Sequence, residues 1–519
     1  MTSHTDVRSD ERTASSTIAV MVENHRNGLG SAAGAAGGVV PAPGRRRMLA
    51  GLLALSGCGL YGVEGPVRAT VRAAIVPGDN PAQREPVALD GFFDDLERRT
   101  FNFFWETANP DNGLIPDRFP ANPEGPNSSI ASVGFGLTAY AIGVERGYIS
   151  REAARERALT TLRFFASLTH GHGFFYHFID LKSGARFRRC ELSTVDTTWL
   201  LAGALFCQSY FDADEPAEVE LRKLADDIYG RVDWNWAQHR APAVTMGWTP
   251  EHGFERDDWL GYDEAMMLYV LALASPTHPV GPDAWRAWTS TYDKHWGTLY
   301  GQTHLSFPPL FGHQYSHVWI DFRGIRDEWM RHRDLDYFEN SRRATYVQRS
   351  YAIDNPMHWR AYGANVWGLT ACDGPGAERG RALGRRERFY SYRARGVGLH
   401  QVIDDGTIAP TAALASLPFA PEIVIPAARE MHERFGPSIY STYGFFDSFN
   451  PTLGEGAGWV DQAYIGIDQG PILAMLENYR SDFVWRVMRG NRYIQRGLKR
   501  AGFEGGWLDK AGESTKGET

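Results

Sequence analysis

The sequence has little cysteine, no long apolar run and no excess of positive charge. Only four of its 519 residues are cysteine, and none has the spacing of a structural zinc site. The formal net charge of -8 disfavours nucleic acid or an anionic membrane surface as the main partner. No apolar stretch reaches the ~20 residues that a membrane-spanning helix needs. A neutral substrate is easier to accommodate than a charged polymer.

Common catalytic signatures are also missing. The chain has no GxSxG motif, no phosphate-binding loop and no dinucleotide glycine pattern after a strand. We therefore expect no cofactor. His170 with His172, or His313 with His317, have spacings compatible with metal binding, but contacts to sugar hydroxyls or structural hydrogen bonds are the simpler interpretation. We expect no bound metal.

The first 88 residues are typical of an export leader and a tether. Arg45-Arg46 and Leu49 resemble a twin-arginine signal, and Leu55-Ser56-Gly57-Cys58 resembles a lipobox. We interpret residues 1–57 as the signal, Cys58 as the lipidated first residue of the mature protein and 58–88 as a flexible tether. The alternative is a plain secretory signal with an incidental cysteine. The expected location is the periplasm or the outer membrane, with membrane contact only through the lipid.

From Leu89 onward, helical periodicity dominates. The predicted helices are Leu89–Thr107, Ser129–Arg146, Ser150–Leu168, Ser193–Phe211, Pro216–Val232, Asp258–Ala274, Pro282–His295, Asp334–Tyr351, Thr407–Leu417, Pro421–Phe435, Ile467–Tyr479 and Ser481–Asn491. No linker interrupts them, so one all-α catalytic domain over 89–500, with a tail at 501–519, is the simplest interpretation. Long loops rich in aromatics and acids recur after roughly every second helix. Helices paired into a closed toroid would bring these loops to one face, where they would line a cleft.

The stretch Gly247–Pro279 couples such a loop to an apolar helix, with Glu264 at the junction. Trp248, Trp259 and Tyr262 precede it. Aromatic faces beside carboxylates suit a sugar ring, although a helix cap within an aromatic core is the structural alternative. Burial would raise the pKa of Glu264, whereas a polar loop would keep Asp447 charged.

Glycoside hydrolysis needs one protonated carboxyl group and one ionised carboxylate. Further acids lie in aromatic surroundings at Glu191, Asp196, Asp461 and Asp468. Asp196 is either a sugar ligand or a partner in a helix cap. Arg323 either fixes a loop through neighbouring acids or binds an acidic sugar.

Eight segments resemble the glycoamylase-like domain of glycoside hydrolase family 144. They are SIASVGFGLTAYAIGVERGYI, STVDTTWLLAGALF, GWTPEHGFERDDWLGYDEAMMLYVLALASPTHP, FGHQYSHVWIDFRGIRD, DYFENSRRATYVQRSYA, NVWGLTACDGP, DGTIAPTAALASLPFAPEI and GIDQGPILAMLENYR, and the resemblance covers about residues 89–494. It implies an (α/α)6 toroid and inverting hydrolysis of β-1,2-glucan, linear or cyclic, to sophoro-oligosaccharides.

Carried onto this sequence, the resemblance makes Glu264 the general acid and Asp447 the general base, with Asp461 and Asp468 as alternatives for the base. The expected substrate contacts are Glu191, Asp196, Trp248, Trp259, Tyr262, His313, His317, Trp319, Arg323, Tyr443, Phe446, Trp459, Asp461 and Asp468. Exo-acting release of sophorose, hydrolysis of α-linked glucans and a non-catalytic glucan-binding lipoprotein stay open as alternatives. We expect a monomer.

The lipobox generates the first testable prediction. Cys58→Ala should release the protein from the membrane fraction, because each buried lipid CH2 contributes roughly 0.8 kcal/mol and several chains make release negligible. Membrane and soluble fractions compared by immunoblot provide the measurement. An unchanged membrane pool would contradict lipidation at this residue.

Overall fold

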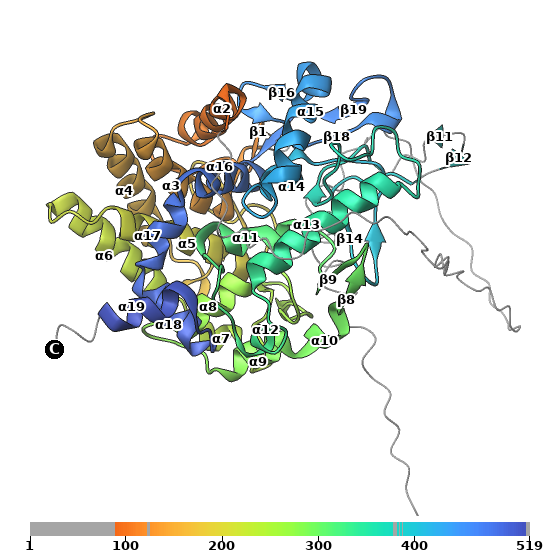
Figure 1. Ribbon diagram of the computed structural model, residues 1–519. Coiled ribbons are helices and arrows are strands. Elements are labelled where there is room, and N and C mark those ends of the chain that lie inside the picture. The colour runs from red at the N-terminus through yellow and green to blue at the C-terminus, as the bar shows by residue number, and fades with distance from the viewer. Residues whose placement is uncertain (1–88, 122–124, 377–380, 383–384, 387, 515–519) are drawn as a thin grey trace, which may run out of the picture.

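The computed structural model describes residues 89–121, 125–376, 381–382, 385–386 and 388–514 (Figure 1). The export signal, Cys58 and the tether lie outside these residues, so they stay predictions. Among the residues described, no helix is both long enough and apolar enough to cross a membrane.

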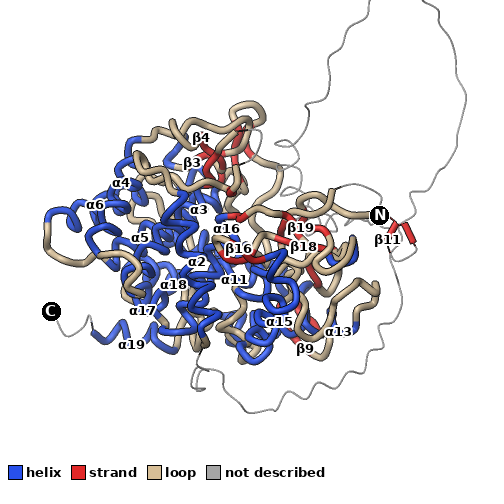
Figure 2. Tube along the Cα trace, turned by 90° about the horizontal axis from the view of Figure 1, so that it is seen from above, coloured by secondary structure: helices blue, strands red, loops and turns tan. Residues whose placement is uncertain are grey.

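Helices make up most of the body (Figures 1 and 2). They are α2 (Gly91–Thr107), α3 (Ile130–Glu145), α4 (Arg151–Ser167), α5 (Thr194–Tyr210), α6 (Pro216–Gly230), α7 (Trp234–Ala237), α8 (Met266–Ala274), α9 (Asp283–Trp288), α10 (Tyr292–His295), α11 (Phe311–Trp319), α12 (Glu328–Arg331), α13 (Tyr337–Asp354), α14 (Pro410–Leu414), α15 (Pro421–Ile439), α16 (Gly466–Ser481), α17 (Phe483–Arg489), α18 (Arg492–Arg500) and α19 (Gly506–Ser514). Single 3-10 turns occupy Gly171–Gly173, Thr289–Thr291 and Pro451–Leu453. The all-α class predicted from the sequence is confirmed.

The strands are short and lie in the loops between helices (Figure 2). They are β1 (Arg118–Phe119), β2 (Asn127–Ser129), β3 (Phe175–Tyr176), β4 (Phe178–Asp180), β5 (Leu192–Ser193), β6 (Gly247–Thr249), β7 (Gly253–Phe254), β8 (Trp296–Leu299), β9 (Gln302–Leu305), β10 (Ala371–Cys372), β11 (Arg381–Ala382), β12 (Arg385–Arg386), β13 (Arg393–Ala394), β14 (Gly396–Val397), β15 (Val402–Ile403), β16 (Tyr440–Ser441), β17 (Gly444–Phe445), β18 (Ser448–Asn450), β19 (Trp459–Asp461) and β20 (Tyr464–Ile465). The largest sheet among them has the order β3-β5-β6-β7, and the others are two-stranded.

The helices divide into an inner and an outer set. On α3, α5, α8, α11, α14 and α16 nearly every side chain is buried, whereas α2, α4, α6, α13, α15 and α18 each keep an exposed face. Inner helices pack side by side: α3 contacts α5, α5 contacts α8, and α14 contacts α16, which returns to α3. Hydrogen bonds join α8 to α11 and α11 to α14. Met267 N–H, on α8, donates to Ser316 Oγ on α11 at 3.0 Å, and Gln314 Nε2 donates to Ala412 O on α14 at 2.8 Å.

Two predicted helices differ markedly from the structure. The helix expected at Asp258–Ala274 begins only at Met266, because the N–H groups of Trp259 and Gly261 donate to carbonyls of other segments and Gly261 has φ +96°. The helix expected at Pro282–His295 is broken at Thr289–Thr291.

The segment Phe311–Trp319, expected to be loop, is the buried helix α11. Beyond residue 500, where a tail was expected, α19 follows α18. Trp507 Nε1 donates to Asp321 O at 2.7 Å, and Leu508 is buried. This part of the tail therefore packs onto the domain.

The tightest contact between inner helices involves two glycines. A Cβ atom built on Gly134 of α3 would lie 2.1 Å from Trp199 O on α5, and one on Gly203 of α5 would lie 2.1 Å from Gly134 O. The backbones of α3 and α5 therefore touch directly, with no room for a methyl group.

This contact predicts that Gly134→Ala lowers the free energy of unfolding by roughly 1–3 kcal/mol, because overpacking pushes α3 away from α5. Urea denaturation followed by circular dichroism measures the change. Gly91→Ala is the matched control, since nothing lies within 4 Å of a Cβ at Gly91. Equal stability of the two variants would contradict the close approach.

Candidate active site

The candidate site lies where several inner helices begin. Strand β5 ends at Ser193 directly before α5, and β20 ends at Ile465 directly before α16. Asp196 and Asp468 therefore lie on the first turns of α5 and α16, and Glu264 lies two residues before α8. The positive end of a helix dipole favours a carboxylate at each of these positions.

Asp263 and Glu264 have different roles at the start of α8. Asp263 Oδ1 accepts hydrogen bonds from Ala265 N–H at 2.9 Å and Trp288 Nε1 at 3.2 Å, so Asp263 holds the turn before the helix and is anchored to the core. Glu264 is 2% exposed, and neither of its carboxyl oxygens has a hydrogen-bond partner among the described residues. Burial raises the pKa of Glu264 well above its ordinary value, and the charges of Asp263 and Asp196 raise it further. The direction of this shift is the one that burial of Glu264 was expected to cause.

A histidine bridges two of the predicted binding carboxylates. His177 Nδ1 lies 2.9 Å from Glu191 Oε1, and Nε2 lies 3.5 Å from Asp196 Oδ1. Burial lowers the pKa of His177, but the two carboxylates outweigh burial and hold it at about 9. Asp196 is also a cap partner, because its N–H donates to Ser193 Oγ at 3.1 Å and its Oδ2 accepts from that hydroxyl at 2.5 Å. The interpretation of Asp196 as a partner in a helix cap is therefore confirmed, and its role as a sugar ligand stays a prediction.

A second group of carboxylates surrounds Asp447. Asp447 Oδ2 accepts the N–H of Asp373 at 2.8 Å, while Oδ1 is buried with no hydrogen-bond partner within the described ranges. Burial raises its pKa well above the usual range, followed by the charges of Asp468, Asp461 and Asp373. The expectation that a polar loop surrounds Asp447 is wrong, because Asp447 is 2% exposed among other acids.

Burial likewise raises the pKa of Asp468 to about 7 and that of Asp461 to about 6. Arg118 provides positive charge here, with Nη2 2.6 Å from Asp373 Oδ2. Asp461 is half-buried, and its Oδ2 has no hydrogen-bond partner in the part of the chain described.

The two groups of acids both lie near Tyr315. The phenol of Tyr315, on α11, has its pKa raised by burial and then by the charges of Asp468, Tyr392, Glu264 and Asp196. Its hydroxyl donates to Ile467 O at 2.9 Å, so it is fixed beside α16. The charge of Asp117 also acts on both groups, because it contributes to the raised pKa of Asp196 in one group and of Asp468 in the other.

Several predicted substrate contacts are buried in the core of the fold. Trp259 Nε1 donates to Thr194 Oγ1 at 3.0 Å, and Trp319 Nε1 donates to Thr138 Oγ1 at 2.9 Å; both rings are buried. His313 and His317 are enclosed, with ring nitrogens 3.1 Å from Phe307 O and 3.2 Å from Ser341 Oγ. Burial lowers the pKa of His313 to about 3 and that of His317 even further below its ordinary value. These four side chains are structural in this fold.

Arg323 and Tyr262 are also structural. Arg323 pairs with Asp321 and Asp482 at 2.8 and 2.9 Å and stacks on Trp485, which matches the loop-fixing alternative. Tyr262 is buried against His313 and Tyr337.

Trp248 lies in β6, and Trp459 in β19; both are half-buried. Tyr443 and Phe446 each pack against Tyr464, close to Asp447. These four aromatic side chains therefore lie in the loops and short strands between the helices.

Asp117, Arg118, His177, Tyr315, Asp373 and Tyr392 are the site residues that sequence reasoning missed. Asp117, Arg118, His177 and Asp373 lie in loops that are rich in aromatic and acidic residues. That composition marks the loops as candidates for the site. It does not show which side chains meet, because this depends on how loops distant in sequence pack together.

Two trios bring possible ligand atoms within 4.8 Å of one another: His177 with Glu191 and Asp196, and Asp373 with Asp447 and Asp461. In the first trio His177 itself provides positive charge, and in the second Arg118 pairs with Asp373. Protein side chains thus supply positive charge to both, and we assign neither to a metal.

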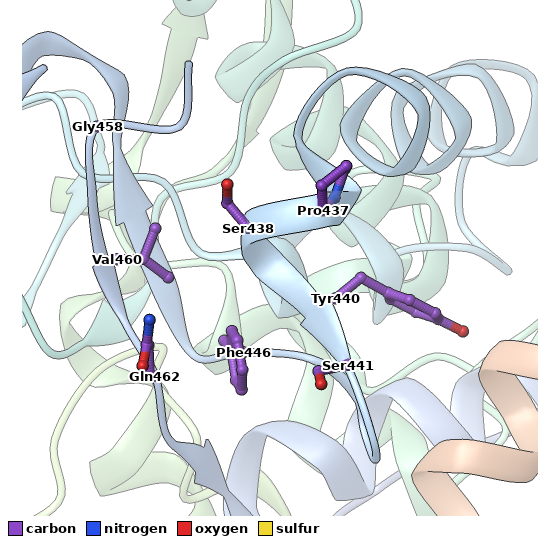
Figure 3. Close-up of a pocket in the computed structure, with 8 residues that line it drawn as sticks. All are labelled: Pro437, Ser438, Tyr440, Ser441, Phe446, Gly458, Val460 and Gln462. Atoms are coloured by element: carbon purple, nitrogen blue, oxygen red, sulfur yellow. The ribbon is translucent and has the colours of Figure 1, made fainter. Parts of the chain in front are cut away.

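A cavity of about 430 Å³ lies behind the second group of acids (Figure 3). Pro437, Ser438, Tyr440, Ser441, Phe446, Gly458, Val460 and Gln462 line it. Figure 3 shows Val460, Gln462 and Phe446 around it. None of the buried carboxylates lines this cavity, and Phe446 is the predicted substrate contact that does.

A mostly helical body with buried carboxylates at one end is the arrangement found in glucoamylase-like glycoside hydrolases. Residues 256–492 match the Glycoamylase family model, described as "Putative glucoamylase". A solved structure of a "putative glucoamylase" from Bacteroides uniformis is 30% identical, with a TM-score of 0.72; the match covers 82% of this chain and 100% of that one. The chain belongs to this family, and its resemblance to glycoside hydrolase family 144 is confirmed.

Two further relatives carry specific names. The endo-β-1,2-glucanase from Chitinophaga pinensis, solved with sophorotriose and glucose, is 29% identical with a TM-score of 0.71; the match covers 81% of this chain and 100% of that one. An exo β-1,2-glucooligosaccharide sophorohydrolase from Parabacteroides distasonis is 29% identical over 448 residues, which are 80% of this chain. This chain spans 58% of that relative's length.

The charge on His177 predicts a pH dependence of stability. Its pKa is about 9 in the folded protein and about 6.5 when unfolded, so its stabilisation is complete below about pH 6.5 and is lost as the pH rises through 9. The loss should be roughly 3 kcal/mol, measured by urea denaturation across that range. His177→Gln should flatten this dependence. A variant with the slope of the wild type would contradict the bridging charge.

Proposed function

We propose that this protein is an inverting glycoside hydrolase that cleaves β-1,2-glucan internally and releases sophoro-oligosaccharides. The observation that carries the proposal is the carboxyl group of Glu264, which is buried without a hydrogen-bond partner among the described residues. Its charge and that of Asp468, from the second acid group, both raise the pKa of Tyr315, so the two groups lie near the same phenol. An acid held protonated opposite a carboxylate is the pair that glycoside hydrolysis requires.

In this mechanism Glu264 donates its proton to the glycosidic oxygen as the bond from that oxygen to the anomeric carbon breaks. A water molecule on the opposite face gives a proton to Oδ1 of Asp447, and its oxygen forms the new bond to the anomeric carbon. The configuration at that carbon is therefore inverted. Glu191 and Asp196, positioned by His177, are suited to binding sugar hydroxyls.

The substrate assignment draws on the relatives, whose names specify β-1,2-linked glucose chains. One relative is named as endo-acting and the other as exo-acting, so release of sophorose from a chain end is the second candidate function. Hydrolysis of α-linked glucan and a non-catalytic glucan-binding role are further alternatives. The presence of both Glu264 and Asp447 favours catalysis over binding alone.

We also propose an (α/α)6 toroid. The inner helices α3, α5, α8, α11, α14 and α16 form its lining, and outer helices cover them. The leader motifs support a periplasmic or outer-membrane location through a lipid on Cys58. We propose that the enzyme acts as a monomer.

The mechanism predicts two inactive variants. Glu264→Gln removes the acidic proton and Asp447→Asn removes the base, so each should lower kcat by on the order of 10² or more while binding is largely kept. Asp196→Asn should act mainly through KM. Near wild-type turnover by Glu264→Gln would overturn the assignment.

The measurement is a reducing-sugar assay on β-1,2-, β-1,3-, β-1,4- and α-1,4-glucans. Proton NMR of the first product resonances identifies the anomer, and retention of configuration would exclude the inverting mechanism. Early products of mixed length indicate endo action, whereas sophorose alone indicates exo action.

A further inference from the structure

A fully buried arginine lies behind the second group of acids. Arg395 is 0% exposed and follows β13. Its Nε and Nη2 donate to Oδ1 and Oδ2 of Asp405 at 2.7 and 2.8 Å, which is the bidentate geometry of strong arginine–carboxylate pairs. Asp405 is also 0% exposed. Because a buried ion pair is costly to desolvate and adds little net stability, stability alone does not account for this one.

The rest of the guanidinium holds the chain segment that contains Asp373. Arg395 Nη1 donates to Cys372 O at 2.8 Å and to Asp373 O at 3.4 Å. The backbone N–H of Arg395 donates to Thr370 O at 3.1 Å. A Cβ atom built on Gly374 would lie 2.1 Å from Arg395 Nη2, so the guanidinium fills the space beside that glycine. Arg395 therefore fixes the backbone on both sides of Asp373.

This segment in turn contacts the proposed base. Asp373 N–H donates to Oδ2 of Asp447 at 2.8 Å, and Asp373 O accepts a hydrogen bond from Ser448 Oγ at 2.8 Å. Asp405 is tied to β18 as well, because its carbonyl accepts a hydrogen bond from Asn450 Nδ2 at 3.0 Å. Oδ1 of Asp447 has no hydrogen-bond partner among the described residues. One oxygen of Asp447 is thus fixed by a backbone donor, and the second is left to accept a proton.

We propose that Arg395 is a positioning residue that, paired with Asp405, places the Asp373 N–H on Oδ2 of Asp447 and leaves Oδ1 to accept the proton of the hydrolytic water. This inference rests on the proposed function and deepens it. Arg395 acts through the Asp373 segment, since its charge is compensated by Asp405. A hydrogen bond from an N–H group favours the ionised form of a carboxyl group, which is the form that a base requires.

Other charged and titratable groups also surround Asp447, and their effects must be separated from that of Arg395. They are Asp373, Asp461 and Asp468, with Arg118, Cys372 and Tyr392. The variant Arg395→Lys leaves all of these side chains in place and keeps a positive charge beside Asp405. A change in the pKa of Asp447 then reports on the Asp373 N–H rather than on a lost charge.

The first test is the kinetics of Arg395→Lys on β-1,2-glucan. Lysine has one nitrogen where arginine has three, so it cannot hold Asp405 and the Cys372 carbonyl together. We expect kcat to fall by on the order of tenfold with KM within a few-fold, because the base is misplaced while the sugar contacts remain. The limb of kcat/KM that rises with pH should move to higher pH by roughly half a unit, because loss of the N–H hydrogen bond raises the pKa of Asp447.

Arg151→Lys is the matched control for this test. Arg151, on the outer helix α4, pairs with the buried Glu218 through two hydrogen bonds of 2.9 Å. The control therefore also removes a bidentate arginine, but it leaves the Asp373 segment untouched. Its pH limb and its kcat per folded molecule should match those of the wild type.

The second test does not depend on activity. Cys372 is 2% exposed and its Sγ lies 3.2 Å from Arg395 Nη1, so its thiol reports whether the segment is held. Burial raises the pKa of this thiol, which slows alkylation. In Arg395→Lys, alkylation of Cys372 by iodoacetamide, mapped by peptide mass spectrometry, should be on the order of tenfold faster than in the wild type. Cys207, fully buried in α5, reports global unfolding in the same sample and should be unchanged.

Gly374→Ala provides an independent variant, because its methyl group would displace the guanidinium without altering Arg395 itself. It should speed alkylation of Cys372 and move the pH limb in the same directions. Gly363→Ala is its control, since the nearest atom to a Cβ at Gly363 lies 4.0 Å away. If Arg395→Lys does not fold, Gly374→Ala supplies both measurements.

An unchanged alkylation rate of Cys372 would show that Arg395 does not hold this segment and would overturn the proposal. Faster alkylation with an unmoved pH limb and an unchanged kcat would overturn it equally, because the segment would then not position Asp447. If the wild type cleaves no glucan, the proposed function fails, while the alkylation rates still decide whether Arg395 holds the Asp373 segment.

Discussion

Desolvation of carboxyl groups is the constraint on which this site depends. Glu264, Asp447 and Asp468 are each at most 5% exposed, and removal of water from an ionised carboxylate costs several kcal/mol unless other groups replace the solvation. The fold offsets this cost in part by placing Asp196 and Asp468 at the positive ends of α5 and α16. The remaining cost is met by holding protons, which gives the site its acid and base chemistry.

The inner helices explain why so many loops can be held in one arrangement. Strands β2, β5 and β20 end at Ser129, Ser193 and Ile465, and a buried helix begins at the next residue in each case. The first residues of α3, α5 and α16 are fixed by packing, so the strand before each helix has a defined direction. Because β1 pairs with β20 and β2 pairs with β4, loops distant in sequence are tied to one another. The site therefore rests on rigid elements, although most of its residues are in loops.

Local signals predicted the long helices, and long-range packing decided the rest. The cap residue Ser150 and the early Pro216 marked the starts of α4 and α6, and both predictions hold. By contrast, α11 was missed because it has only nine residues and its buried positions include the polar His313, Gln314 and His317. The position of Glu264 beside an apolar helix was readable from the sequence. The environment of Asp447 was not, because Asp461, Asp468 and Asp373 reach it from three separate segments.

The two groups of acids differ in the positive charge that compensates them. Around Glu191 and Asp196, the positive charge is on His177, which lies between the two carboxylates and offsets part of the rise that burial causes in the pKa of Asp196. Around Asp447, Arg118 is paired with Asp373 and the buried Arg395 is paired with Asp405. The cation of the first group therefore lies between the acids that it compensates, whereas the cations near the second group are engaged by acids other than Asp447.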